Sequence, residues 1–70
     1  MILLAVRNNL KEIRMTKYMM DQKSFAKMIG ISNTTYNNLE TNRVVGNIET
    51  ALKIAKALNL PVEEIWILED

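Results

Sequence analysis

The feature that most constrains the fold is the spacing of a few small and apolar residues in the first half of the chain. Ala26 stands four residues after Gln22, and Gly30 stands four residues after Ala26. Tyr36 follows Gly30 by six residues, and Leu39 follows Tyr36 by three. A small residue lets two helices approach closely, and glycine adopts the left-handed conformation that a sharp turn requires. The spacing predicts two helices joined by a tight turn, with Tyr36 and Leu39 anchoring the second helix on the first.

Capping residues mark where these helices and a later one begin. Asp21, Ser32 and Asn47 each stand where a side-chain oxygen can accept a free backbone N–H of a first helical turn. The helix after Ser32 is expected to end near residue 41. The helix after Asn47 is expected over residues 48–58, and Asn59 can end it in a left-handed conformation. Its predicted apolar stripe consists of Ile48, Ala51, Leu52, Ala55 and Leu58.

The remaining segments predict a first helix, a short fifth helix and two strands. Residues 6–16 have helical apolar spacing, and Pro61 suits the first turn of a short helix. Residues 2–6 and 65–68 are short, apolar and mostly β-favouring, so we expect them to pair as a two-stranded ribbon. The alternative, in which residues 1–6 extend the first helix, stays open. The expected fold is a single all-α domain over residues 1–70, with five helices and a ribbon formed by the two ends.

Composition excludes several classes of function. The chain of 70 residues has no Cys and no His, which rules out disulfides, thiolate or imidazole metal sites, and imidazole or thiol catalysis. So small a domain leaves little room for a catalytic cleft, and we expect no enzyme activity, metal, cofactor or small-molecule ligand. The longest apolar run, residues 1–6, is too short to span a bilayer. A cytoplasmic protein is expected.

Charge is unevenly distributed, although the net charge is only +1. All nine Lys and Arg residues lie between Arg7 and Lys56, with four acidic residues among them, so this stretch sums to +5. Beyond Leu60 there are four acidic residues and no base, which sum to −4. The pattern fits a body that meets an anion and a tail that does not, although an ordinary solvated surface would fit it equally.

The central segment is similar to a known family of regulators. The run Gln22-Lys-Ser-Phe-Ala-Lys-Met-Ile-Gly-Ile-Ser32, continued by Asn33-Thr-Thr-Tyr-Asn-Asn-Leu-Glu40, resembles the lambda-repressor and Cro-like (Xre-type) regulators. The resemblance begins near Asn9 and continues through residues 48–58 and 62–65. It implies a helix-turn-helix over residues 22–40 in a homodimeric, sequence-specific DNA-binding protein. The second helix of the motif would lie in the major groove, and the first would cross the phosphate backbone.

The resemblance also implies roles for individual residues. The base-reading positions would be Asn33, Thr34, Asn37 and Asn38. Phosphate contacts are expected from Gln22, Lys23, Ser32, Thr35 and Arg43, whose donors suit phosphate oxygens. Gln22 would in addition steady the first base-reading residue. Since Asn can bond adenine N6 and N7 together and Thr can offer a methyl group to thymine, we expect some preference for A·T pairs.

An ion pair between Arg14 and Glu40 is expected from the resemblance, because Glu40 matches an acid that pairs with an Arg of the first helix in many members. Four departures from the family pattern bear on the structure. Tyr36 stands where Val or Ile is common. The connection over residues 15–21 is one residue longer than usual, which bears on whether Arg14 can reach Glu40. Asn42 stands where Gly is common, and Asn tolerates left-handed angles. Gly46 stands where Pro is common.

The expected function is transcriptional regulation by a homodimeric repressor of bacterial or phage type. Its operator would be a pseudo-palindrome with half-sites about 34 Å apart. The expected dimer region comprises residues 1–6 and 60–70, with Ile65, Trp66, Ile67 and Leu68 in the interface. Whether Trp66 fills the core or the dimer seam stays open. The alternative function is a protein-interaction or antitoxin-like module on the same fold, with weak or no specific DNA binding.

Overall fold

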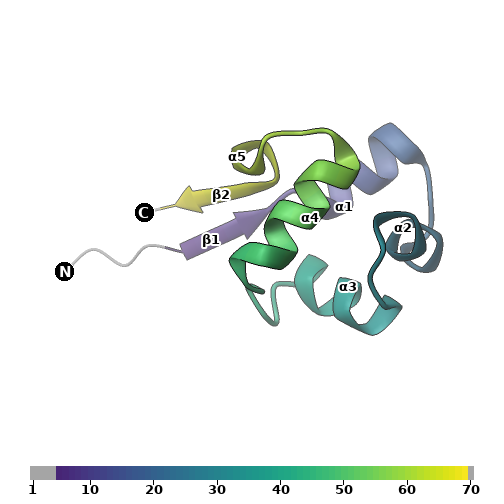
Figure 1. The fold of residues 1–70 in the computed structure, drawn as a ribbon, viewed down its shortest axis with the longest axis horizontal. Helices are drawn as coiled ribbons and strands as arrows, with labels where there is room; N and C mark the ends of the chain where they lie inside the picture. Colours follow the sequence, from purple (N-terminus) through teal and green to yellow (C-terminus); the bar gives the residue numbers. More distant parts are fainter. Residues whose placement is uncertain (1–4, 70) are drawn as a thin grey trace.

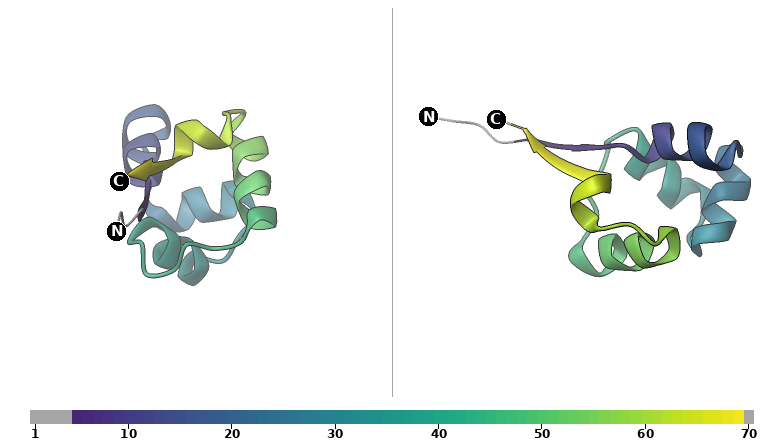
Figure 2. Two further views of the ribbon diagram at one scale, coloured as in Figure 1. Left: turned by 90° about the vertical axis from the view of Figure 1, so that its left-hand side faces the viewer. Right: turned by 90° about the horizontal axis from the view of Figure 1, so that it is seen from above.

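A computed structural model describes residues 5–69, which form a helical body with a two-stranded ribbon at one end (Figures 1 and 2). The helical motif consists of α2 (Gln22–Ile29) and α3 (Asn33–Glu40). Around it lie α1 (Leu10–Ile13), the π-helical turn η1 (Arg14–Tyr18), α4 (Ile48–Leu58) and α5 (Val62–Ile65). Within residues 5–69, no helix has both the length and the apolar character needed to cross a membrane.

The ribbon joins the two ends of the described chain. β1 (Ala5–Asn8) pairs antiparallel with β2 (Trp66–Glu69), with Val6 opposite Leu68. The predicted ribbon is therefore confirmed at residues 5–6 and 66–68, whereas Ile65, expected in the second strand, is the last residue of α5. Residues 2–4 of the prediction lie outside the described part. Helix α1 begins only at Leu10, so the helical reading of residues 6–9 was wrong. Val6 belongs to the strand because its main chain pairs with β2.

The predicted helix caps are confirmed. The side chains of Asp21, Ser32 and Asn47 accept hydrogen bonds from the backbone N–H groups three residues further along. Asn59 ends α4 at a φ of 56°, in the left-handed region. Polar side chains thus fix the first turns of α2, α3 and α4, including the Asn- and Thr-rich α3, whose residues are poor helix formers.

One contiguous core holds the helices together. Phe25 and Tyr36 meet edge to face with their ring centroids 5.3 Å apart, which fixes α2 against α3. The buried apolar side chains come from α1, α2, α3, α4 and α5: Leu10, Ile13, Phe25, Ala26, Ile29, Tyr36, Leu39, Ile54, Ala55, Leu58 and Ile65. Tyr36 and Leu39 join α3 to this core, so packing against the other helices stabilises α3.

The apolar stripe predicted for α4 was partly wrong. Ala55 and Leu58 are buried as expected, but Ile54 is buried with them. Ile48 is 70% exposed and Leu52 is 54% exposed. The helix turns the face of Ile54 toward the core, because α2 and the short α5 both pack on that side. The stripe of Ile48 and Leu52 is left on the surface beside the ribbon, where no other described element covers it.

A wider helical turn takes up the additional residue between α1 and α2. In a π-helix each N–H bonds to the carbonyl five residues earlier, so one turn holds more residues than an α-helical turn. Here the N–H of Met19 bonds to the carbonyl of Arg14, and Met19 itself is left-handed at a φ of 51°. The chain then enters α2 at Asp21. The longer connection is thus absorbed locally, and Arg14 still faces α3.

Candidate nucleic-acid interface

The turn between α2 and α3 brings the two helices close together. Gly30 has a φ of 85°, and the N–H of Ile31 bonds to the carbonyl of Ala26 over 3.0 Å. The side chain of Ala26 is buried where α2 approaches its neighbours, and Tyr36 and Leu39 fill the core beneath α3. A turn of this kind presents the first turn of α3 outward while its last turn is held by the core.

The outward face of α3 is polar and uncharged. Asn33, Thr34 and Thr35 are exposed, and Asn37 and Asn38 are half-buried. Ser32 caps the helix, and its hydroxyl also donates to Oγ1 of Thr35 over 2.8 Å. Amide and hydroxyl groups can both donate and accept hydrogen bonds, which suits contact with the edges of bases.

Positive charge lies beside α3 rather than on it. Lys23 in the first turn of α2 and Arg43 just beyond α3 are both exposed. The side chains of these two residues make no ion pair or hydrogen bond with any described residue, whereas Lys53 pairs with Glu49 on α4. The ammonium and guanidinium groups of these two exposed residues are the kind of donor that suits phosphate oxygens.

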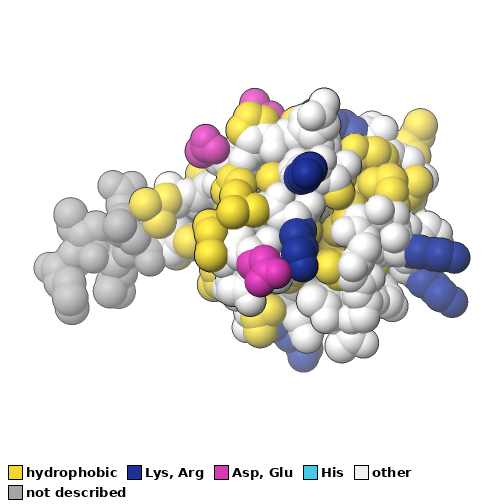
Figure 3. All heavy atoms as spheres, viewed as in Figure 1, with side chains coloured by type: hydrophobic (Ala, Val, Ile, Leu, Met, Phe, Trp, Pro, Cys, Tyr) yellow, Lys and Arg dark blue, Asp and Glu magenta, His cyan; other side chains and the backbone are white. Residues whose placement is uncertain are grey.

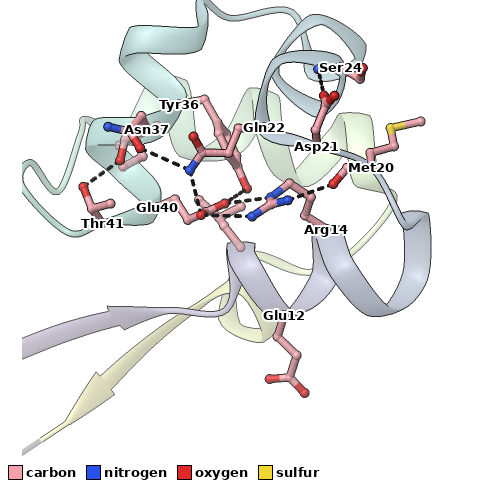
Figure 4. Close-up of polar contacts among 12 residues, drawn as sticks. Glu12, Arg14, Met20, Asp21, Gln22, Ser24, Tyr36, Asn37, Glu40 and Thr41 are labelled. Atoms are coloured by element: carbon pink, nitrogen blue, oxygen red, sulfur yellow. Dashed lines mark hydrogen bonds and ion pairs between the residues drawn. The ribbon is translucent and has the colours of Figure 1, made fainter.

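A hydrogen-bonded network anchors α3 from behind (Figure 4). Arg14 of η1 donates to Glu40 through Nε over 3.0 Å and through Nη2 over 3.3 Å. Tyr36 donates its hydroxyl to the same carboxylate, and Gln22 donates Nε2 over 2.9 Å. Arg14 donates in addition to the main-chain carbonyl of Met20 over 2.8 Å. One carboxylate thus ties α3 to the first turn of α2 and to the π-helical turn.

The network keeps Glu40 ionised. Burial of the carboxylate raises its pKa, but the hydrogen bonds from Arg14, Tyr36 and Gln22 outweigh this effect and hold the pKa below its ordinary value. The same contact with Glu40 raises the pKa of Arg14. Burial, followed by the nearby Glu40, raises the pKa of the Tyr36 hydroxyl. Glu40 therefore accepts hydrogen bonds from all three neighbours and donates none.

Gln22 contacts a different residue of α3 from the one expected. Its Nε2 donates to Oδ1 of Asn37 over 3.1 Å, in the second turn of α3. Asn33, the first base-reading residue of the prediction, makes no described hydrogen bond with Gln22. The two amides meet because the Gln22 side chain, at the start of α2, points toward Asn37 of α3, as Figure 4 shows.

The expected dimer residues divide into one core residue and three surface residues. Ile65 is fully buried in the core of its own chain, so its side chain is not available to a partner, and its place in the predicted interface was wrong. Trp66 and Ile67 are half-buried, and Leu68 is 64% exposed. Trp66 packs against the core and also lines a surface groove. Its expected place in a dimer seam stays a prediction.

Sequence reasoning missed the apolar surface beside the ribbon. A groove of about 200 Å³ lies between the ribbon, the loop before α4 and α5, and is lined by Val6, Val45, Gly46, Asn47, Ile48, Ala51, Val62 and Trp66. Figure 3 shows hydrophobic side chains gathered on this face of the molecule. The sequence does hold a sign of this surface, because α4 has more apolar residues than its inward face buries. Ile54, Ala55 and Leu58 are buried, and Ile48 and Leu52 are left exposed. We call the exposed side chains of Val45, Ile48, Leu52 and Leu68 the apolar patch.

Among residues 5–69, no group of three or more acidic side chains is arranged to hold a metal ion. The site therefore consists of the amides and hydroxyls of α3 and two exposed cations, Lys23 and Arg43. Such a fold and site define a helix-turn-helix domain of the kind that docks a helix into DNA.

The comparisons with known proteins agree with this class. The helix-turn-helix family matches residues 10–65, so the chain belongs to that family, which includes the lambda-repressor-like regulators. Two relatives from Archaeoglobus fulgidus, each named as an uncharacterized HTH-type transcriptional regulator, are 32% identical over 65 residues. The aligned region covers 93% of this chain and 91% and 90% of the relatives. A similarly named protein from Methanocaldococcus jannaschii is also 32% identical over 65 residues. This alignment covers 93% of this chain and 97% of that protein. These relatives are archaeal, which does not support the expected bacterial or phage origin.

Proposed function

We propose that this protein is a sequence-specific DNA-binding transcriptional regulator that inserts α3 into the major groove. The observation that carries the proposal is the exposed, uncharged, amide- and hydroxyl-rich face of α3, bordered by Lys23 and Arg43. Family membership and the printed names of the relatives support the same role. Because DNA is the ligand, the protein acts in the cytoplasm.

Within this proposal, the residues of α3 divide by their position. Asn33 and Thr34 in the first turn, with Asn37 and Asn38 in the next, read base edges. Phosphates are bound by exposed groups at the edge of the motif, namely Lys23, Ser32, Thr35 and Arg43. The free Oε1 of Gln22 only accepts, and its Nε2 is committed to Asn37 and Glu40. A phosphate contact from Gln22 would therefore require its amide to leave the network.

The proposed active form is a homodimer joined through the apolar patch and the ribbon. Exposed apolar side chains on a small domain are costly in water, and a two-fold interface needs a patch that is complementary to itself. The patch is apolar and adjoins a Glu49–Lys53 pair of zero net charge, so two copies can meet without repulsion. A dimer would present two α3 helices about 34 Å apart to a pseudo-palindromic operator, and its simplest action is repression by occupying that site.

The proposal is tested by the salt dependence of binding to duplex DNA. Fluorescence anisotropy would give the affinity from about 50 to 200 mM salt, and log K should fall steeply with log salt because phosphate contacts release counterions. Lys23→Ala should reduce the slope by about 1. Asn33→Ala is the matched variant on α3 and should leave the slope unchanged while lowering affinity for a preferred site. A folded protein with no salt-dependent binding would instead favour the protein-interaction module, for which the apolar patch would be the docking surface.

A further inference from the structure

The hydrogen-bond chemistry of Glu40 sets the orientation of the neighbouring Gln22 amide. An ionised carboxylate can only accept hydrogen bonds. The carboxylate of Glu40 is 5% exposed and held by Arg14, so it stays in place and charged. Gln22 must therefore turn its Nε2, not its Oε1, toward Glu40, as the 2.9 Å contact requires. The reversed amide would bring two acceptors together without a proton between them.

The second proton of Gln22 then sets the orientation of Asn37. Nε2 carries two protons, and the one not given to Glu40 is donated to Oδ1 of Asn37 over 3.1 Å. The reversed Asn37 amide would oppose one donor with another. Asn37 consequently holds its oxygen inward and its Nδ2 away from Gln22, as Figure 4 shows. Nδ2 donates to no other residue between 5 and 69, so both of its protons are available on the outer side of α3.

We propose that Gln22 is a positioning residue that fixes Asn37 as a hydrogen-bond donor toward DNA, so that Asn37 selects a base edge carrying two acceptors. This inference rests on the proposed function and specifies what Asn37 reads. In the major groove, guanine presents N7 and O6 as two acceptors, whereas adenine presents N7 beside the N6 donor. Asn37 therefore favours guanine over adenine, in contrast to an unrestrained Asn, which bonds adenine through its oxygen and nitrogen together.

The other amides of α3 provide an internal contrast. Neither the Asn33 nor the Asn38 side chain hydrogen-bonds to a residue in the described part of the chain, so each amide can rotate to match the base it meets. The A·T preference expected for unrestrained Asn applies to these two positions. Asn37 is thus restricted to donating toward DNA, whereas Asn33 and Asn38 on the same helix can both donate and accept.

The test compares base preference in variants that keep the same helix surface. A preferred duplex would be selected from a randomised pool with the wild-type protein, and each base pair would then be replaced in turn. The pair whose replacement no longer matters in Asn37→Ala is the pair that Asn37 reads. At that pair we expect wild type to prefer guanine over adenine by about fivefold or more. In Gln22→Met, which keeps the length of the side chain and removes its protons, Asn37 can rotate, so the preference for guanine should be lost and should shift toward adenine.

Lys23→Ala is the control, because it should weaken binding to all sequences alike and keep the preference for guanine. A Gln22→Met variant that retains the preference for guanine would overturn the inference, as would a preference of the wild-type protein for adenine or the absence of any pair sensitive to Asn37→Ala. Failure of wild type to select any sequence is a different result, because it overturns the proposed function itself and this inference with it.

A measurement on the free wild-type protein tests the orientation without DNA. Side-chain amide exchange by NMR should show both Nε2 protons of Gln22 protected and both Nδ2 protons of Asn37 exchanging at the rate of an exposed amide. Protection of the Asn37 protons, with free exchange at Gln22, would overturn the inference whether or not Gln22→Met folds.

Discussion

The side-chain amide of Asn8 joins the ribbon to the end of the proposed recognition helix, because its Nδ2 donates to the main-chain carbonyl of Leu39 over 2.8 Å. The Oδ1 of the same side chain accepts from the N–H of Leu10 over 3.1 Å and fixes the start of α1. Asn42 adds a second link, since its Nδ2 donates to the carbonyl of Val6 over 3.2 Å. The last turn of α3 is thus held by the strand that borders the apolar patch.

Removing the Asn8 amide should destabilise the domain moderately. Asn8→Ala loses two hydrogen bonds and should lower the free energy of unfolding by about 1–3 kcal/mol. Asn8→Ser can keep the contact to Leu10 but not the one to Leu39, so it should lose about half as much. Urea unfolding followed by circular dichroism measures both. Equal stability of wild type and Asn8→Ala would contradict the role given to this side chain.

Loss of the Glu40 carboxylate should be far more damaging than loss of an exposed one. Glu40→Ala leaves Arg14 charged and only 12% exposed without its partner, which should cost about 3–5 kcal/mol. The matched variant Glu49→Ala breaks the Glu49–Lys53 pair, whose side chains are 74% and 71% exposed, and should cost less than about 1 kcal/mol. Thermal and urea unfolding of the two variants provide the comparison. Similar losses would mean that the buried network does not anchor α3.

Stability should fall in acid because the pKa of Glu40 is lower in the folded than in the unfolded protein. The unfolded chain then binds the proton more readily, so the contribution of Glu40 is present above the ordinary pKa of a Glu, about 4.3, and is lost as the pH falls through the lower folded pKa. Asp21 acts in the same direction, because a hydrogen bond from the N–H of Ser24 lowers its pKa. Asp21→Asn keeps a capping oxygen and removes this second contribution.

In the Asp21→Asn background, the acid-induced loss that remains should come largely from the network. Urea midpoints between about pH 5 and 2.5 measure it. Adding Glu40→Gln should flatten the dependence on pH, provided that the double variant folds. If it does not, the Glu40 carboxyl can be titrated by NMR in the wild-type protein. A midpoint at or above the ordinary Glu value would refute the account.

The two glycines should differ in their tolerance of alanine. Gly30 and Gly46 have φ values of 85° and 84°, so alanine at either position incurs the left-handed penalty of about 1–2 kcal/mol. A Cβ on Gly30 meets nothing within 4 Å, whereas a Cβ on Gly46 would lie 2.9 Å from Cδ2 of the buried Leu39. Gly46→Ala should therefore destabilise the fold more than Gly30→Ala does. The order of their urea midpoints tests this, and the reverse order would contradict the packing of Leu39 against the loop.

Charge introduced in the apolar patch should dissociate the proposed dimer. Ile48→Lys places a cation on a side chain that is 70% exposed, so the monomer fold should tolerate it while the interface should not. Met15→Lys is the matched control, because Met15 is also largely exposed but lies on η1, outside the patch. Sedimentation equilibrium would measure the association of each. A dimer unaffected by Ile48→Lys would place the interface elsewhere.

The parts of the fold that could be predicted are those set by local chemistry. Asp21, Ser32, Asn47 and Asn59 fix helix ends through their own side chains or angles, and the structure agrees at all four positions. The antiparallel ribbon was predicted for a similar reason, since β-favouring residues at both ends had no other partner. The helix ends depend on a few neighbouring residues, so the sequence alone is informative about them. The ribbon pairs the two ends of the described chain, and for it the sequence supplied the β-favouring residues but not the register.

The parts that could not be predicted depend on how distant elements meet. Helical periodicity does not say which of two adjoining stripes on α4 faces the core, and Ile54 is buried because of where α2 and α5 lie. Contact between Gln22 and Asn37 follows from the crossing of α2 over α3, which no spacing specifies. Ile65 resembled a surface residue of a strand, but it closes the core as the last residue of α5.

Selection of binding sites from a randomised duplex pool at about physiological salt tests the central claim most directly. The account predicts a two-fold symmetric motif whose half-site centres are separated by about one turn of DNA, roughly 34 Å. Asn33→Ala should relax the motif at the base pair that Asn33 reads while keeping salt-dependent binding. A wild-type protein that is folded but enriches no sequence would contradict the claim that α3 reads DNA.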